Sequence, residues 1–294
     1  MRKIALLAVV AFAAACGSST SDPGSGFLRV ANLSPSVAAI DYCIKAAGGT
    51  YSAPVMAGLG ATDGLVYGGY GDKMIGKYIS YTAGAYTVGV YQKGLPGASC
   101  TNPAYTVDVT ISNGGSYTVA LTGQTGVTGG PVALRSYTDA NTADPTKVII
   151  RFVNTGFLQV PPMPAATVLP AFDIGYQLLG GAFTLLFDNV AYPGFAAATN
   201  GVNAAGYNAV NPSILTTGTT LYSCGHGFTP ATPGACQPIT LPTGAPITGG
   251  IIASAFTIGN YGTDANYSLF CGDNQPPPLL GYPYALCVTN TAPF

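Results

Sequence analysis

The chain has 294 residues, of which 7% are charged: ten Lys or Arg, eleven Asp and no Glu. So little positive charge cannot neutralise a run of phosphates, which excludes nucleic acid as a partner. Glycine (40 residues) and proline (23) disfavour helices, whereas 48% hydrophobic residues and 19 tyrosines supply the apolar surface of a folded, strand-rich chain. The composition therefore predicts an all-β protein rather than a helical or disordered one.

The first segment has the parts of a secretory signal. Two basic residues precede Ile4–Ala15, an uncharged run of 12 residues that is too short to cross a bilayer as a helix. The residues at its end, Ala13-Ala14-Ala15-Cys16, resemble a bacterial lipoprotein box, in which the cysteine receives a diacylglycerol and becomes the mature N-terminus. We therefore expect residues 1–15 to be a cleaved lipoprotein signal peptide and Cys16 to be the lipid attachment site. An ordinary signal peptide with a chance cysteine is the alternative.

Residues 16–26 follow as a lipidated cysteine and a flexible tether rich in Gly and Ser. Each buried methylene contributes about 0.8 kcal/mol, so two or three acyl chains, palmitate among them, would anchor the chain stably where one would not. Gly17 rather than Asp follows the cysteine. By resemblance to Gram-negative lipoproteins, this favours the outer membrane over retention in the inner one. The expected location is the cell envelope, at the outer membrane or cell surface, with the membrane as one partner.

Alternating apolar and polar residues predict strands in the first half of the mature chain. Ala85–Gln92, Tyr105–Ile111 and Ser116–Gly123 each place apolar side chains at every second position. Ser112–Gly115 (SNGG), between the last two, is typical of a hairpin turn. Several short strands separated by turns favour a β-sandwich.

The second half of the chain repeats motifs of the first. Leu28–Asn32 (LRVAN) recurs as Ile150–Asn154 (IRFVN), and Ala39–Ile44 (AIDYCI) recurs as Ala171–Tyr176 (AFDIGY). Weaker matches follow in the same order, Thr110–Thr118 with Thr240–Thr248 and Leu134–Asn141 with Leu269–Asn274. The pattern predicts two tandem β-sandwich domains, residues 27–144 and 145–294. The residues of the repeat signature are Arg29, Asn32, Asp41, Arg151, Asn154 and Asp173.

One apolar stretch of the second half, Ala165–Phe187, has the length of a membrane span. Pro170, Asp173 and a Gly-Gly pair interrupt it, and aspartate at a bilayer centre is costly. We therefore expect this stretch to form two strands and a turn.

Apart from Cys16 the chain has six cysteines, and an even number in an exported protein is typical of disulfides. Fifteen connectivities are possible for six cysteines. The division of the cysteines between the halves, and their closeness in sequence, favour Cys43–Cys100, Cys224–Cys236 and Cys271–Cys287. His226, the only histidine, lies beside Cys224, but no C-x-x-C pair accompanies it, so we expect no metal there.

Catalytic patterns are missing from the sequence. No G-x-S-x-G motif occurs, the single histidine lies in a Gly-rich loop, and the aspartates are scattered. Asp139, Asn141 and Asp144, or the segment Thr263–Asn266, could supply oxygen ligands to calcium. Asp and Asn also form turns by bonding their own backbone, and turn formation is favoured here. The sequence therefore predicts no catalytic residues, cofactors or metals.

The segment Leu28–Ile44, LRVANLSPSVAAIDYCI, resembles the opening of the domain-of-unknown-function family 4397. Members of the family open with Arg-Val-Val-(His/Asn)-x-Ser-Pro-Asp-Ala-Pro-x-Val-Asp-Val-Tyr, and "AGAYTVGVY" resembles its Gly-x-Tyr-x-Val-x-Val strand. Ser36 and Ala38 depart from the pattern. The resemblance covers most of residues 27–140 and rests on Arg29, Val30, Asn32, Ser34, Pro35, Asp41 and Tyr42.

The resemblance implies immunoglobulin-like or transthyretin-like sandwiches in exported bacterial proteins, often in tandem and lipid-anchored, with no established catalytic residues. We further expect Arg29 and Asp41 to pair and lock the first two strands. Together these observations predict a lipid-anchored cell-envelope protein that is not an enzyme. Its role would be binding, adhesion or surface structure, with a glycan, matrix or envelope protein as partner. The alternative is an envelope hydrolase that uses aspartates which the sequence alone does not pair.

Overall fold

The computed structural model describes residues 24–68, 73–158, 166–215, 219–239, 248–261, 268–273, 285 and 287–290. Strands hold 50% of these described residues and helices 4%, which confirms the prediction of an all-β chain built of β-sandwiches. Within these ranges no helix is both long and apolar enough to cross a bilayer. Cys16 and the predicted signal peptide, residues 1–15, lie outside the described residues.

The first half of the chain forms two facing sheets. One has the strand order β4 (Ile79–Thr82), β1 (Ser25–Asn32), β7 (Ser116–Thr122) and β8 (Ala133–Asp139). The other has β3 (Leu65–Val66), β2 (Ala39–Ala46), β5 (Gly84–Gln92) and β6 (Tyr105–Ile111), with the short helix α1 (Val55–Gly58) beside β2. Val30, Val88 and Leu121 are among the apolar side chains that fill the core of this sandwich.

The second half has the same two-sheet plan. Its inner sheet consists of β9 (Val148–Asn154), β18 (Ile252–Thr257), β20 (Ser268–Gly272) and β21 (Cys287–Asn290), with β14 (Gly194–Phe195) and β15 (Asn208–Val210) beside β9. Its outer sheet has the order β13 (Phe183–Val190), β12 (Phe172–Leu178), β16 (Thr219–Gly225) and β17 (Cys236–Ile239). A small third sheet joins β11 (Thr167–Val168), β10 (Phe157–Leu158) and β19 (Asn260–Tyr261), and the 3-10 helix η1 spans Pro212–Leu215.

The internal repeat is visible in the strand pairing. In the first half β1 runs parallel to β7, which pairs antiparallel with β8. In the second half β9 runs parallel to β18, which pairs antiparallel with β20. The registers also agree, since Arg29 lies opposite Thr118 and Arg151 lies opposite Ser254. Leu28–Asn32 and Ile150–Asn154, which recur in the sequence, therefore occupy equivalent places.

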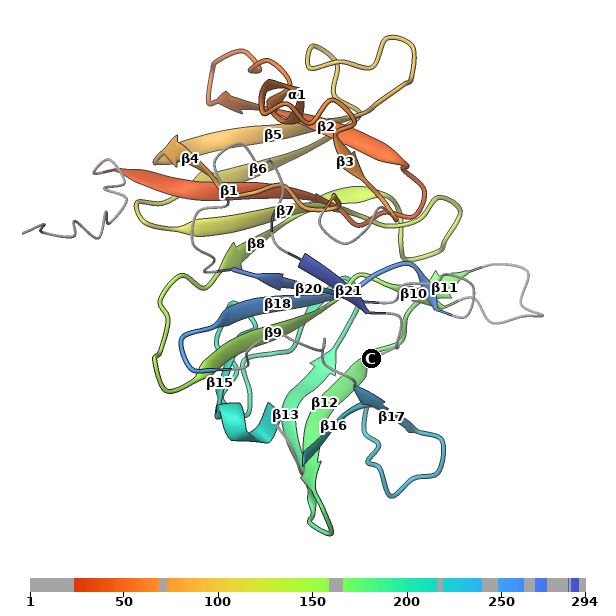
Figure 1. Cartoon of the computed structure of the whole chain (residues 1–294). Coiled ribbons are helices and arrows are strands. Elements are labelled where there is room, and N and C mark those ends of the chain that lie inside the picture. Colours follow the sequence, from red (N-terminus) through yellow and green to blue (C-terminus); the bar gives the residue numbers. More distant parts are fainter. Residues whose placement is uncertain are drawn as a thin grey trace, which may run out of the picture.

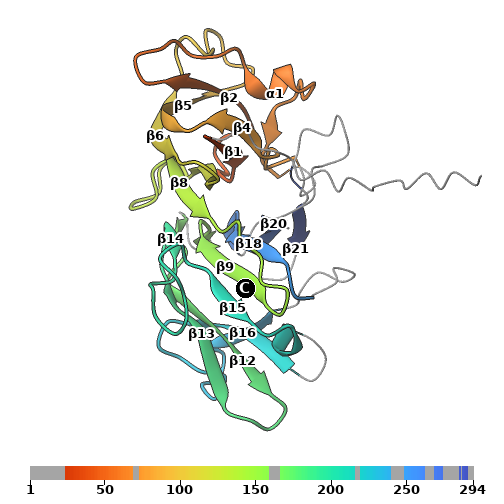
Figure 2. The same ribbon diagram turned by 90° about the vertical axis from the view of Figure 1, so that its left-hand side faces the viewer.

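The four large sheets are stacked in four layers, with the first half (red to yellow) above the second (green to blue) in Figures 1 and 2. A third core lies between the two sandwiches and contains Ala31 and Ala120 from the first half with Val153 and Phe256 from the second. Nearly every described residue of β1, β7, β9 and β18 is therefore buried. In an isolated sandwich, one face of these strands would be open to water.

Ser112–Gly115 joins β6 to β7, but the predicted hairpin is wrong. β6 pairs with β5, whereas β7 pairs with β1 and β8 in the opposite sheet. A Gly-rich turn specifies a reversal of the chain but not the partner of the next strand. Here the reversal carries the chain from one sheet to the other, so Val109 and Val119 enter the same core from different sheets.

Disulfide bonds join Cys43 to Cys100, Cys224 to Cys236 and Cys271 to Cys287, as predicted. The first ties β2 to the segment between β5 and β6. The other two link residues that lie directly opposite each other on neighbouring antiparallel strands. Disulfides form and persist in oxidising compartments, so the three bonds indicate an extracytoplasmic protein.

The apolar stretch Ala165–Phe187, described from Ala166 onward, contains two strands and a turn, as predicted. β12 and β13 pair antiparallel, and the amide of Gly181 donates to the carbonyl of Leu178 at 2.8 Å to close the turn between them. The β12–β13 hairpin projects from the end of the molecule that is remote from the first half (Figures 1 and 2).

Candidate functional site

The arginines of the repeat signature lie in a buried polar network where the two halves meet. The side chains of both arginines and of their aspartate partners are fully buried. Each member of the network in one half has an equivalent in the other. We call this set the interface network; its members are Arg29, Tyr78, Thr118, Asp139, Arg151, Tyr207, Ser254 and Asp273.

Arg29, on β1, binds the second half of the chain. Its Nη2 pairs with the carboxylate of Asp273, and its Nη1 donates to the carbonyl of Gly272 at 3.4 Å. Its Nε donates to Thr118 Oγ1 at 2.8 Å, and the guanidinium lies 4.5 Å from the ring centroid of Tyr78. Burial alone would lower the pKa of Arg29, but Tyr78 and Asp273 more than offset this, so its pKa is raised and the side chain stays charged.

Arg151, on β9, makes the equivalent contacts in the opposite direction. Its Nη2 pairs with Asp139 of the first half, and its Nη1 donates to the carbonyl of Thr138 at 2.8 Å. Its Nε donates to Ser254 Oγ at 2.8 Å, and its guanidinium lies 4.6 Å from the ring centroid of Tyr207. The two ion pairs therefore cross the interface in both directions, related by the internal repeat.

Two hydroxyl groups of its own half complete the surroundings of each aspartate. These hydrogen bonds, 2.6–2.7 Å long, run from Tyr78 and Thr118 to Asp139 and from Tyr207 and Ser254 to Asp273. Burial raises the pKa of both tyrosines, so their hydroxyls stay protonated donors. Each guanidinium nitrogen and each carboxylate oxygen has a partner. The chemistry of the network is therefore to fasten the halves, and no group in it is left to act on a substrate.

The predicted pair between Arg29 and Asp41 is wrong. Leu28 and Val30 take the positions of β1 that face its own core, so Arg29 points toward the other half. Asp41 lies on β2, in the other sheet of the first half. Its carboxylate accepts hydrogen bonds from the backbone N–H groups of Met56 at 2.9 Å and Ala57 at 3.0 Å. Asp41 thus holds the start of α1 rather than a neighbouring strand.

The asparagines of the repeat signature, Asn32 and Asn154, hold loops at equivalent places. Both are buried, and each directs its Nδ2 to backbone carbonyl groups. The acceptors are Val37 and Leu65 for Asn32, and Leu169, Pro170 and Val190 for Asn154. These two residues are therefore structural.

The candidate calcium ligands have other partners. Asp139 belongs to the interface network, and Asn141 donates to the carbonyl of Gly114. Asp144 accepts the backbone N–H and the hydroxyl of Thr146, at 2.8 and 2.7 Å, which is the turn formation that the sequence favours. The other candidate segment, Thr263–Asn266, lies outside the described residues.

Asp173, Asp188 and His226 form a cluster whose ligand atoms are close enough to hold a metal ion. His226 Nδ1 lies 2.9 Å from Asp173 and 3.5 Å from Asp188. A carboxylate only accepts, so Nδ1 carries a proton and donates a hydrogen bond to Asp173. The hydrogen bond and charge of Asp173, with a smaller contribution from Asp188, raise the pKa of His226. A metal would therefore have to displace a proton that Asp173 already holds in place.

The remaining partners of Asp173 indicate a structural role for this cluster. Its carboxylate also accepts the backbone N–H of Asn189 at 2.7 Å and of Gly227 at 2.8 Å. Asp173 thereby ties the segment after β16 to the end of β13, much as Asp41 holds α1 in the first half.

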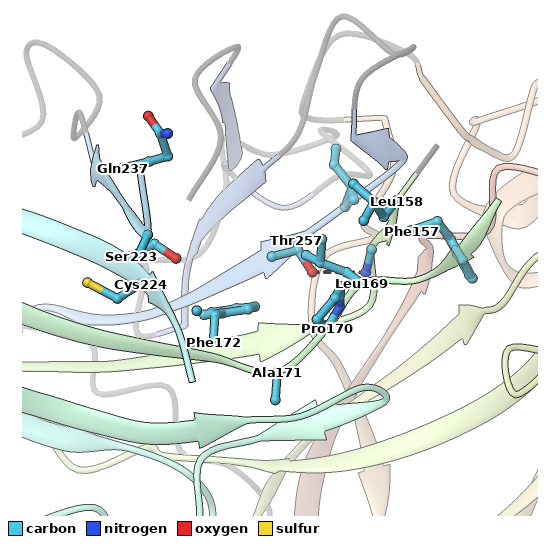
Figure 3. Close-up of a pocket in the computed structure, with 14 residues that line it drawn as sticks. Phe157, Leu158, Leu169, Pro170, Ala171, Phe172, Ser223, Cys224, Gln237 and Thr257 are labelled. Atoms are coloured by element: carbon cyan, nitrogen blue, oxygen red, sulfur yellow. Dashed lines mark hydrogen bonds between the residues drawn. The ribbon is translucent and has the colours of Figure 1, made fainter. Parts of the chain in front are cut away.

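A small pocket opens in the second half between β10 and the strands β16 and β17 (Figure 3). Its volume is about 180 Å³, below the roughly 300–1,000 Å³ of sites for drug-sized ligands. Ser223, Gln237 and Thr257 add polar atoms, but no Asp, His, Lys or Arg occurs among the described residues that line it. Its walls are mostly apolar, from Phe157, Leu158, Leu169, Pro170 and Phe172. We call it the apolar pocket; it suits an aliphatic group rather than an ion.

Sequence reasoning missed several members of the interface network. It singled out Arg29 and Arg151 but not their partner Asp273, nor the rings of Tyr78 and Tyr207. The weak match of Leu134–Asn141 with Leu269–Asn274 contains both aspartates, but a one-residue gap is needed to align Asp139 with Asp273. A pair of aspartates at equivalent positions in a repeat that also duplicates a buried arginine could have pointed to the crossed ion pairs.

Comparison with known proteins gives one family match, over part of the chain. Residues 26–159 match the model of a family described as a domain of unknown function, DUF4397, which confirms the resemblance seen in the sequence. No curated protein matches the chain. Among solved structures, the Bacillus anthracis TIE protein is similar with a TM-score of 0.21 and 11% identity, over 80% of this chain and 33% of that one. The chain thus spans about a third of that protein's length.

Proposed function

We propose that this chain, whose residues 26–159 match the DUF4397 family model, is a non-enzymatic binding module held at the cell envelope by a lipid on Cys16. Residues 16–26 tether it to the outer membrane. The sandwiches present loops and strand edges to a glycan, to matrix or to another envelope protein. Adhesion and surface structure are the roles that follow from such an arrangement.

The observation that carries the proposal is how the buried charged groups are used. The four ionic side chains of the interface network, Arg29, Asp139, Arg151 and Asp273, are paired with one another and sealed from water. The described residues that line the apolar pocket include no acid or base. Catalysis requires an acid, base or nucleophile that reaches a substrate. Because the buried charged groups of this chain join its two sandwiches, a binding role fits them better than a catalytic role.

One cluster favours the alternative, an envelope hydrolase. Asp188 and His226 are 38% and 47% exposed, so a substrate could reach them, and His226 lies beside two carboxylates that could orient it. If the chain hydrolyses ester or glycoside substrates, and His226→Gln and Asp188→Asn abolish the activity while unfolding as the wild type does, this alternative replaces the binding role.

The proposal is tested by shaving intact cells with a protease. Residues 152–294 contain no Lys or Arg, so trypsin would spare this half and proteinase K is the appropriate enzyme. We expect the wild-type protein to be stripped from whole cells, to incorporate labelled palmitate and to partition into detergent. Cys16→Ser should lose the label and leave the membrane fraction. A protein that survives until the outer membrane is opened faces the periplasm, and a Cys16→Ser variant that stays attached contradicts the lipid anchor.

A further inference from the structure

The β12–β13 hairpin ends in two exposed leucines, Leu178 and Leu179, which we call the leucine tip. Their side chains are 54% and 98% exposed, respectively. From Ile174 to Phe187 no residue is charged. The hairpin projects from the end of the second half that is remote from the first (Figures 1 and 2). Because these two leucines are exposed, they add nothing to the core of their own sandwich. Exposed apolar side chains on a projecting turn are typical of an interaction site.

The apolar pocket of the same half matches the tip in size and chemistry. Its volume of about 180 Å³ is too small for most organic ligands but is sufficient for an aliphatic side chain. Phe157, Leu169 and Phe172 offer it an apolar wall (Figure 3). At protein interfaces, a side chain seated in such a pocket is the usual form of a binding anchor.

The two features lie at opposite ends of one strand. Phe172, at the start of β12, lines the pocket, and Leu178, at the end of β12, begins the tip. Six residues of a strand span about 20 Å. A chain therefore cannot place its own tip in its own pocket, and any contact between them joins two molecules.

The charges of the second half favour another copy of this chain as the occupant. Residues 152–294 contain no Lys, Arg or Glu. Without Lys or Arg, this part of the second half lacks the usual means of holding phosphate headgroups or an acidic partner. Two copies, however, meet with almost no charge to desolvate or repel, a condition that promotes association.

We propose that the leucine tip of one molecule inserts into the apolar pocket of a second. The contact uses different surfaces on the two partners, so its repetition in one direction gives a ring or an open linear assembly, whereas two molecules that exchange tips reciprocally close a dimer. The inference names a partner for the binding module of the preceding subsection and rests on it only for the cellular setting. The contact is small, so in solution a Kd of about 0.1–1 mM is expected. Confinement on a membrane raises the effective concentration to about that range.

Sedimentation equilibrium of the chain from Gly17 onward, which carries no lipid, tests the proposal. We expect the average mass to rise between about 10 µM and about 1 mM, the range that brackets the expected Kd. Leu179→Asp should weaken association at least about tenfold, as loss of an interface anchor does. Leu95→Asp is the matched control, because Leu95 is 53% exposed but belongs to the first half, and it should associate as the wild type does.

Pocket variants distinguish head-to-tail assembly from other contacts. Ala235→Phe should fill the pocket, and Gln237→Lys, at an exposed position, places a charge at its mouth without disturbing the core. Each should remain monomeric, with a far-UV spectrum and melting temperature like those of the wild type. A mixture of Leu179→Asp with a folded pocket variant retains one intact tip and one intact pocket. It should form a one-to-one dimer and nothing longer.

Three results would overturn the proposal: a wild-type chain that stays monomeric throughout, pocket variants that still associate, or a mixture that does not dimerise. The second result would indicate a symmetric contact between tips. None of these outcomes bears on Cys16, so failure here is distinguishable from failure of the lipid anchor in the shaving experiment.

Discussion

The two halves of the molecule share their interior polar residues and differ on their surfaces. Arg29 and Arg151 make equivalent contacts, and so do Asn32 and Asn154. In contrast, every Lys and Arg of the chain occurs at or before Arg151, so most of the second half has neither residue. The apolar pocket and the leucine tip belong to the second half alone. What the halves share holds the molecule together, and where they differ is where a specific partner should bind.

The strongest test of the shared part is to break one ion pair at a time. Arg29→Ala leaves Asp273 buried without its partner, and Arg151→Ala does the same to Asp139. Removing one member of a buried pair costs about 3–5 kcal/mol. We expect both variants to lose that much free energy of unfolding in urea, and by similar amounts because the contacts are equivalent. Lys73→Ala, at an exposed position, is the control. A loss below about 1 kcal/mol in either half would show that the network is not what holds the sandwiches together.

Replacing both partners sharpens the same comparison. Arg29→Met combined with Asp273→Leu removes both charges and keeps apolar volume in the interface. Such replacements are often neutral or stabilising, because the cost of desolvating two ions disappears. We expect the double variant to recover most of the stability that Arg29→Ala loses. A double variant as unstable as the single one would mean that the hydroxyl groups of Thr118 and Tyr207 depend on the ions.

The disulfides should also differ between the halves. Cys43–Cys100 spans 57 residues of sequence, whereas Cys224–Cys236 spans 12. In the chain-entropy model these loops correspond to about 4 and about 3 kcal/mol. Replacing both cysteines of a bond by Ala should therefore destabilise the first half more, as measured by urea unfolding without reductant. Equal losses would mean that the native contacts, and not the length of the closed loop, set the stability.

The buried asparagines give a smaller difference. Asn154 holds three carbonyl groups and Asn32 holds two. Leaving a buried polar group without its partner costs about 1–3 kcal/mol, so Asn154→Ala should lower the melting temperature more than Asn32→Ala. Asn102→Ala, in an exposed turn, should have no measurable effect. If Asn32→Ala has the larger effect, packing around the loop outweighs the number of hydrogen bonds.

Much of the fold is predictable from the sequence because its causes are local. Alternation along Tyr105–Ile111 and Ser116–Gly123 predicts β6 and β7, and the spacing of the cysteines predicts the three bonds. The partner of β7 is not predictable in this way, since a turn such as Ser112–Gly115 does not select a sheet. The interface network depends on contacts between residues that are distant in sequence, Arg29 with Asp273, so no local pattern marks it.

A hint of the buried interface does exist along β7. Thr118, Ala120 and Thr122 form the second face of this strand, and all three are fully buried. In a sequence, small and weakly polar residues suggest a strand face that is exposed to water. Their small size, however, also lets two sheets pack closely. The apolar pocket and leucine tip could not be predicted either, because a pocket needs several strands in place and a leucine in sequence does not reveal its exposure.

The smallest expected difference between the halves is a dependence on pH. Asp41 binds only backbone N–H groups, whereas Asp173 also binds His226, whose pKa it raises. A raised pKa in the folded state means that the protonated histidine stabilises the fold. This contribution is fully present below the ordinary pKa of 6.5 and is lost as the pH rises through the higher folded-state value. His226 is 47% exposed, so the effect should be small.

The measurement is the free energy of unfolding of wild type and His226→Gln at about pH 5.5 and about pH 8.5, on either side of the titration. The wild type should be the more stable of the two at the lower pH, and the difference should shrink at the higher pH. Asp188→Asn should reduce the pH dependence only in part, because Asp188 is the more distant carboxylate. If His226→Gln is instead more stable than wild type at low pH, the charged imidazolium destabilises the fold. Asp173 would then hold the segment after β16 only through the backbone N–H groups of Asn189 and Gly227.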